Sequence, residues 1–108
     1  MSRVGQGEFQ FDVIADWARL PEGWTFGWVP GVAVDSRDRV IVSSRSDHPL
    51  VIFDTEGNVL ESWEDTVLVP ENAHGIYIDG DDNVYLTEWL GHCVYKFNSA
   101  GELQWTLG

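Results

Sequence analysis

His74 is the residue of this chain whose type and position most clearly suggest chemistry. It lies in the stretch PENAHGIYID, residues 70–79, which aligns without a gap with FGWVPGVAVD, residues 26–35. The alignment pairs His74, a residue type that can bind a metal, with Pro30. Because the equivalent position holds a proline, the local fold does not require a histidine there. We therefore consider His74 a candidate metal ligand, with an inert hydrogen-bonded histidine as the alternative.

The residues around His74 belong to an internal repeat with a constant offset of 44 positions. When residues 31–64 are laid over residues 75–108, seven of the 34 positions are identical. The identical pairs are Gly31/Gly75, Asp35/Asp79, Asp38/Asp82, Val40/Val84, His48/His92, Phe53/Phe97 and Gly57/Gly101. Many other positions match in chemical type, and the turn residues recur at the same places. The chain is therefore built largely from two copies of one unit.

Each copy predicts four short strands, because its apolar runs are rich in Val, Ile, Tyr and Phe. We expect strands at residues 31–35, 39–44, 50–54 and 58–63, and again at 75–79, 83–88, 93–98 and 102–107. Stretches such as DSRD and DGDD separate them, and Asp, Asn and Gly favour tight turns. The apolar runs do not alternate cleanly, which is typical of strands buried on both faces. The fold class is therefore all-β.

Four-stranded units at this period are the pattern of a β-propeller. We expect a disordered start at residues 1–7, an N-terminal strand with an aromatic connection at 8–29, blade 1 at 30–64, a linker at 65–73 and blade 2 at 74–108. Two blades cannot close a ring, and fewer than about three repeats leave much apolar surface bare. The chain is therefore either a fragment of a longer propeller or a protomer that closes a ring with copies of itself.

Composition narrows the classes of partner. The chain has 108 residues with 6 basic and 18 acidic side chains, and its formal net charge is -12. This balance argues against nucleic acid and anionic membranes, because both attract positive charge. The start MSRVGQGEF has no apolar signal segment, and no apolar run is long enough to span a bilayer, so we expect a cytoplasmic protein. Cys93 is the one cysteine, which excludes a disulfide within the chain.

Both copies of the unit resemble the NHL repeat. The segments LPEGWTFG, GVAVDSRDRV, RSDHP, AHGIYID and VYLTEWLGHCVYKF further resemble the N-terminal part of peptidyl-α-hydroxyglycine α-amidating lyase and its bacterial relatives, over about residues 8–108. This resemblance implies a six-bladed propeller that is much longer than this chain. It also implies zinc bound by three histidines in the central channel, and cleavage of a peptidyl-α-hydroxyglycine into a peptide amide and glyoxylate.

The resemblance gives His74 and Arg45 candidate roles. His74 matches the first zinc histidine of the family, in an HG at the start of an inner strand. A homotrimer of two-blade chains would form a six-bladed ring and place three copies of His74 around its axis, so that three imidazoles could hold one zinc. Arg45 matches the catalytic arginine of the family, which could stabilise negative charge or bind a carboxylate. The alternative for Arg45 is a solvated loop residue paired with Asp47.

Five further residues are candidates, either for contacts in the site or for a structural role in the blades. Glu88 and Trp89 lie at the equivalent edge of blade 2, and we expect them, with Asp47, to be candidate contacts to a substrate or to the channel. Trp89 could instead pack between chains. His48 and His92 occupy the same place in both copies, which favours a structural role with a side-chain bond to the backbone.

Calcium is not expected from this chain alone. Residues 79–88 contain alternating acidic residues, but Val84 and Leu90 stand where an EF-hand needs Gly and Glu. The calcium site of the lyase family also needs an aspartate from a blade that this chain lacks.

Two functions stay open. One is a zinc-dependent carbon–nitrogen lyase-like site, with a peptide or small molecule in the channel. The other is a self-assembling propeller scaffold or binding module without turnover, which is favoured because the catalytic tyrosine of the family cannot be placed in this chain.

Overall fold

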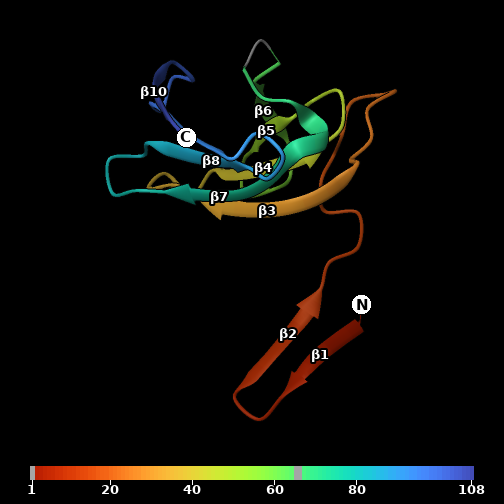
Figure 1. Ribbon diagram of the computed structural model, residues 1–108. Coiled ribbons are helices and arrows are strands. Elements are labelled where there is room, and N and C mark those ends of the chain that lie inside the picture. Colours follow the sequence, from red (N-terminus) through yellow and green to blue (C-terminus); the bar gives the residue numbers. More distant parts are fainter. Residues whose placement is uncertain (1, 65–66) are drawn as a thin grey trace.

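The computed structural model describes residues 2–64 and 67–108, which form two four-stranded sheets and an N-terminal hairpin (Figure 1). The first sheet contains β3 (Trp28–Val34), β4 (Val40–Arg45), β5 (Leu50–Phe53) and β6 (Val59–Ser62). The second contains β7 (Ala73–Ile78), β8 (Val84–Glu88), β9 (Cys93–Phe97) and β10 (Leu103–Leu107). The 3₁₀ helix η1 (Pro70–Asn72) precedes β7, and the hairpin consists of β1 (Ser2–Gln6) and β2 (Phe9–Val13). No helix in the described part of the chain is long and apolar enough to cross a membrane.

Each sheet is an antiparallel meander in which strands that follow one another in the sequence pair with one another. The eight strands predicted from the repeat are therefore confirmed, and the two sheets are blade 1 and blade 2. The first strands of the two blades, β3 and β7, lie side by side (Figure 1). They approach so closely that a Cβ added at Gly31 would lie 2.8 Å from Ile76. This position requires glycine because the inner strands of neighbouring blades meet there.

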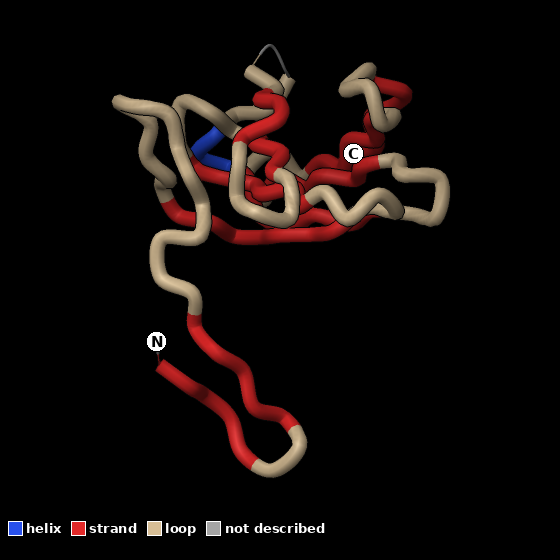
Figure 2. Tube along the Cα trace, turned by 180° about the vertical axis from the view of Figure 1, so that it is seen from behind, coloured by secondary structure: helices blue, strands red, loops and turns tan. Residues whose placement is uncertain are grey.

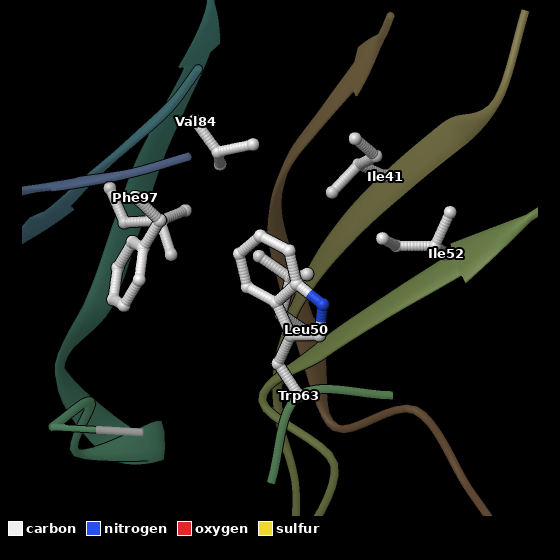
Figure 3. Close-up of a cluster of buried hydrophobic side chains, with 7 residues drawn as sticks. Ile41, Leu50, Ile52, Trp63, Val84 and Phe97 are labelled. Atoms are coloured by element: carbon white, nitrogen blue, oxygen red, sulfur yellow. The ribbon is translucent and has the colours of Figure 1, made fainter. Parts of the chain in front are cut away.

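The core lies between the two sheets (Figure 3). Its buried members are Ile41, Leu50 and Ile52 from blade 1, Trp63 from the segment after β6, and Val84, Leu86 and Phe97 from blade 2. The rings of Trp63 and Phe97 are 5.6 Å apart between centroids. Burial of each large apolar side chain stabilises the fold by roughly 1.5–3 kcal/mol. The blades therefore hold one another together face to face.

A second cluster covers the opposite face of blade 1. Val42, Val51 and Phe53 are buried there beneath the aromatic connection that follows the hairpin. The covering residues of this connection are Trp17, Ala18, Leu20, Trp24 and Phe26. The central strands β4 and β5 are thus covered on both faces, which explains why they have continuous apolar runs.

The N-terminal hairpin extends away from the two sheets (Figure 2). A disordered start and a single strand were predicted here, whereas residues 2–6 form β1 and pair with β2. The hairpin turns through Gly7 with φ 62°, and an ion pair of 3.0 Å joins Arg3 to Asp12 across it. Every residue of both strands is exposed, including the apolar side chains of Phe9 and Phe11.

Candidate functional site

His74 occupies a β-bulge at the start of the inner strand of blade 2. Ala73 pairs with Glu88 and Gly75 with Thr87, so His74 is an extra residue without a partner on β8. A bulge bends the strand and turns the side chain away from the regular alternation, and bulges are common beside functional sites. The His74 side chain is exposed. The predicted ligand is therefore accessible at the edge where the inner strand begins.

Pro30 lies at the equivalent irregularity in blade 1. Trp28 pairs with Arg45 and Gly31 with Ser43, so β3 also carries one extra residue between its pairs. A proline has no N–H to donate, and within sheets it is confined to edges, strand starts and bulges. Both copies of the unit thus bulge at the same place, and the residue at the bulge is free to differ.

Arg45 is held beside the His74 bulge by two contacts. Its Nε donates a hydrogen bond of 2.9 Å to the backbone oxygen of Ala73, the residue immediately before His74. Its guanidinium carbon lies 5.7 Å from the ring centroid of Trp28, within the range of a cation–π contact. The alternative ion pair with Asp47 does not form among the described residues, and Asp47 is exposed. The two principal candidates, Arg45 and His74, therefore meet at one edge of the blades.

Glu88 faces into the protein, whereas Trp89 faces outward. One carboxylate oxygen of Glu88 accepts a hydrogen bond of 2.8 Å from the backbone N–H of Val69, and the other accepts from the Tyr95 hydroxyl at 3.4 Å. Burial, followed by the nearby charge of Glu88, raises the pKa of Tyr95 to about 12. Trp89 donates its backbone N–H to Asn72, and its side chain is 50% exposed. Glu88 thus attaches the linker to blade 2, and Trp89 remains accessible.

The two repeat histidines have different surroundings. Nδ1 of His48 lies 2.6 Å from a carboxylate oxygen of Glu64, and its ring stacks on Trp24 with centroids 3.5 Å apart. His48 therefore bonds a carboxylate rather than the predicted backbone group. His92 is exposed in a turn with φ 53° and makes no matching contact among the residues that the structure describes. The shared sequence position does not give the two side chains a shared environment.

Trp28 is a neighbour of Arg45 that the sequence patterns did not reveal. It is 78% exposed and lies across the β3–β4 pair from Arg45, whose guanidinium it contacts. The pairing of Trp28 with Arg45 across β3 and β4 is the signal that could have identified it.

One chain alone does not supply a complete metal site. In residues 2–64 and 67–108, no three His, Cys, Asp or Glu side chains lie together so that they could hold a metal ion. The described chain also encloses no pocket. The residues present therefore do not fit a three-histidine zinc site within a single chain.

Comparison with known proteins places the chain among NHL-type propellers. No family model matches it. It is 34% identical to NHL repeat-containing protein 3 of Mus musculus, over 71% of this chain and 24% of that protein. It is 31% identical to peptidylglycine alpha-amidating monooxygenase of Rattus norvegicus, over 85% of this chain and 12% of that protein. The chain thus spans a quarter or less of either relative.

The fold agrees with this relationship. Virginiamycin B lyase from Staphylococcus aureus superimposes with a TM-score of 0.55 over 70% of this chain and 25% of the lyase, at 17% sequence identity. At that identity the likeness concerns the fold alone. The chain is an NHL-repeat protein made of propeller blades, and it is related to both NHL repeat-containing protein 3 and the amidating monooxygenase.

Proposed function

We propose that this chain contributes two blades to a six-bladed ring, and that His74 and Arg45 form part of a lyase-related ligand site at the inner edge of that ring. The observation that carries the proposal is the 2.9 Å bond from Arg45 Nε to Ala73 O, which holds a guanidinium beside the His74 bulge. The relationship to the amidating monooxygenase and the HG and RSDH segments support the same assignment.

Three copies of the chain would complete the site. A homotrimer would bring together three His74 imidazoles, and three histidines with one open position are a catalytic type of zinc site. Arg45 of each copy would lie at the same edge, where a guanidinium can bind a carboxylate through two hydrogen bonds. A peptide or small molecule with a carboxylate is therefore the ligand class that we propose.

A scaffold without turnover is the second candidate. It is favoured by the contacts of Glu88, whose two carboxylate oxygens both accept hydrogen bonds from blade 2 and the linker. With Glu88 occupied in this way, the described part of one chain offers few groups for acid–base chemistry beside Arg45.

Zinc titration followed by an activity assay tests both candidates. We expect about one zinc per three chains, complete loss of binding in His74→Ala, and unchanged binding in His92→Ala, which removes another exposed histidine. Zinc-loaded protein should release glyoxylate from a peptidyl-α-hydroxyglycine, and Arg45→Lys should slow this at least about tenfold because lysine cannot bind a carboxylate bidentately. Zinc binding that survives His74→Ala would reject the metal site, and zinc binding without glyoxylate would support the scaffold.

A further inference from the structure

Blade 2 has a partly exposed face that corresponds to a buried face of blade 1. Blade 1 contacts blade 2 through Ile41, Leu50 and Ile52. At the offset of 44 positions, their equivalents on blade 2 are Tyr85, Val94 and Lys96. We call these residues, with Tyr77 and Trp105, the free face of blade 2.

Aromatic side chains dominate this free face. The rings of Tyr77 and Tyr85 are 5.8 Å apart between centroids, and those of Tyr85 and Trp105 are 6.0 Å apart. Nζ of Lys96 lies 5.6 Å from the centroid of the Tyr85 ring. Tyr77 is 65% exposed. Trp105 is 41% exposed, whereas Tyr85, Val94 and Lys96 are half-buried within the single chain.

Blade 1 carries the matching half of the same contact. Blade 2 meets blade 1 through Val84, Leu86 and Phe97, with Ile76 and Ile78 packed beside them. Their equivalents on blade 1 are Val32, Val34, Val40, Val42 and Phe53, of which Val42 and Phe53 are buried beneath the aromatic connection. We call the exposed residues Val32 and Val34 the free face of blade 1. The inner-strand members of this set are uncovered, because Val32 is 60% exposed and Val34 is 56% exposed.

The connection before blade 1 is arranged like the segment between the blades. Trp63 precedes blade 2 and packs against Phe97 with centroids 5.6 Å apart and ring planes at 49°. Trp17 precedes blade 1 and packs against Phe53, the equivalent of Phe97, with centroids 5.5 Å apart and ring planes at 52°. Blade 1 therefore has the tryptophan of an interblade contact, but no blade of this chain lies behind it.

A hydrogen-bonded pair joins a turn of blade 1 to a turn of blade 2. The residues at the equivalent positions of the same two turns form no such pair within the described chain. Asp82 in blade 2 accepts bonds from the backbone N–H of Ser36 at 2.8 Å and from its hydroxyl at 2.6 Å. Asp38, the equivalent of Asp82, has nearly the same φ, 59° against 63°. The Asp38 carboxylate forms no hydrogen bond or ion pair within the described chain, and the equivalent of Ser36 is Gly80.

We propose that the free face of blade 2 binds the free face of blade 1 on a second copy of this chain, repeating the contact that joins the two blades within one copy. Both halves of the interface are present in a single chain, so copies can join head to tail and close into a ring. Gly80 of one copy would then present its N–H to Asp38 of the next. Three copies give the six blades of the proposed function, on which this inference rests.

The composition of the free face favours a second chain as its occupant. Ile41, Leu50 and Ile52 of blade 1 are aliphatic and buried, whereas the free face of blade 2 has two tyrosines, a tryptophan and a lysine. Tyr and Trp are enriched at protein interfaces, because they bury a large area and retain a polar group that tolerates water before assembly.

Disruption of the free face should dissociate the assembly. We expect native mass spectrometry of the metal-free full chain to show a species of about 37 kDa, three times the 12.2 kDa of one chain. Tyr77→Glu should shift it to the monomer, because a charge would be buried without a partner. Leu90→Glu, which changes a similarly exposed residue in the turn after β8, is the matched control and should leave the trimer intact.

A second experiment adds one hydrogen bond to the proposed interface, and it does not depend on whether Tyr77→Glu folds. Gly80 has no atom within 4 Å of an added Cβ, so a side chain fits there. Gly80→Ser supplies the hydroxyl that Ser36 gives to Asp82, and should tighten assembly about tenfold, as expected for a bond to a carboxylate. Gly80→Ala should have no such effect, and Asp38→Ala should abolish the gain.

The outcomes separate this inference from the metal site. Trimers of His74→Ala that no longer bind zinc, or trimers of the parent chain without zinc, support the interface even if the metal proposal fails. A monomer at all concentrations, a broad spread of masses, or a Gly80→Ser gain that persists without Asp38 would overturn the head-to-tail interface.

Discussion

Four short polar side chains organise the turns between strands, and each is matched to the residue four positions later. Each accepts hydrogen bonds of 2.9 to 3.0 Å from the backbone N–H groups two and four residues on, and they are Asp35, Asp54, Asp79 and Asn98. The second side-chain atom meets a complementary partner, and the pairs are Asp35–Arg39, Asp54–Asn58, Asp79–Asn83 and Asn98–Glu102. An acceptor thus always faces a donor.

This matching predicts the effect of exchanging Asp79 and its partner. Asp79→Asn should lower the Tm by a few degrees, because two amide N–H₂ groups would then face each other. The double variant with Asn83→Asp should recover most of the loss, since it reverses the pair as in Asn98–Glu102 and keeps the net charge of the parent. Thermal unfolding followed by circular dichroism measures both. Equal stability of the single and double variants would contradict the pairing.

The Tm difference between the parent and Asp79→Asn depends on pH in a defined direction. Partial burial acts to raise the pKa of Asp79, but hydrogen bonds from Asn83, Tyr85 and Asp81 outweigh it and lower the pKa from 3.8 to about 2. A carboxylate whose pKa is lower in the folded chain than in the unfolded chain stabilises the fold at pH values above the unfolded pKa. This stabilisation is lost as the pH falls from 3.8 towards 2. The Tm difference between the parent and Asp79→Asn should therefore narrow over this pH range.

At the residue scale, the sequence predicted that His74 and Arg45 lie at one edge better than it predicted their contacts. That this edge forms a ligand site stays a prediction. His74 and Arg45 were placed from the repeat and the family resemblance, and the structure brings them to one edge. The inward direction of Glu88 and the contact of Trp28 with Arg45 could not be predicted. Both depend on the one-residue offset that a bulge introduces into strand pairing, and the apolar pattern alone does not reveal it.

At the scale of elements, Trp63 is the main link between the two sheets. It follows β6, is buried between the blades, and its Nε1 has no hydrogen-bond partner among the residues that the structure describes. Trp63→Ala should destabilise the fold by about 3–5 kcal/mol, because it leaves a cavity in the core. Trp63→Phe should cost less than about 2 kcal/mol, because it also removes a buried N–H that lacks a partner.

Denaturant unfolding of three variants tests this difference. Trp28→Ala is the matched control, since its side chain is mostly exposed, and it should change the free energy of unfolding by less than about 1 kcal/mol. Equal losses for Trp63→Ala and Trp63→Phe would mean that the indole contributes through an interaction other than packing.

The same scale shows where sequence patterns succeed and fail. The eight blade strands were predictable because apolar runs and Asx or Gly turns mark both their ends in each copy. The hairpin was not, because SRVGQ has little apolar content and a two-stranded hairpin is only marginally stable by itself. β2 was predictable from its likeness to β10, in GEFQFDV and GELQWTL.

At the scale of the whole molecule, the blade count predicts that the two blades need neighbours, and the structure shows which of their surfaces are exposed. The repeat alone could not show this, because a bulge in β3 and β7 changes which side chains share a face. Once the faces are known, the offset of 44 positions identifies the residues of the proposed interface between chains.

Net charge predicts how this assembly responds to salt. Each chain has a formal charge of -12, so copies that approach one another repel at long range. The Debye length falls from about 30 Å at about 0.01 M salt to about 10 Å at about 0.1 M, which screens this repulsion. The proposed interface relies on aromatic burial and a hydrogen bond to Asp38, neither of which needs low salt. The dissociation constant of the trimer should therefore fall several-fold as sodium chloride is raised over this range.

Sedimentation or mass photometry at several salt concentrations measures this response. Lys96→Gln is the informative variant, because Lys96 is the cation of the free face of blade 2. If its ammonium only stacks on Tyr85, the variant should keep the salt dependence of the parent. The assembly could instead weaken with added salt and lose this sensitivity in Lys96→Gln. That result would mean that Lys96 forms an ion pair with an acidic residue of the neighbouring copy, and that this ion pair outweighs the repulsion between chains.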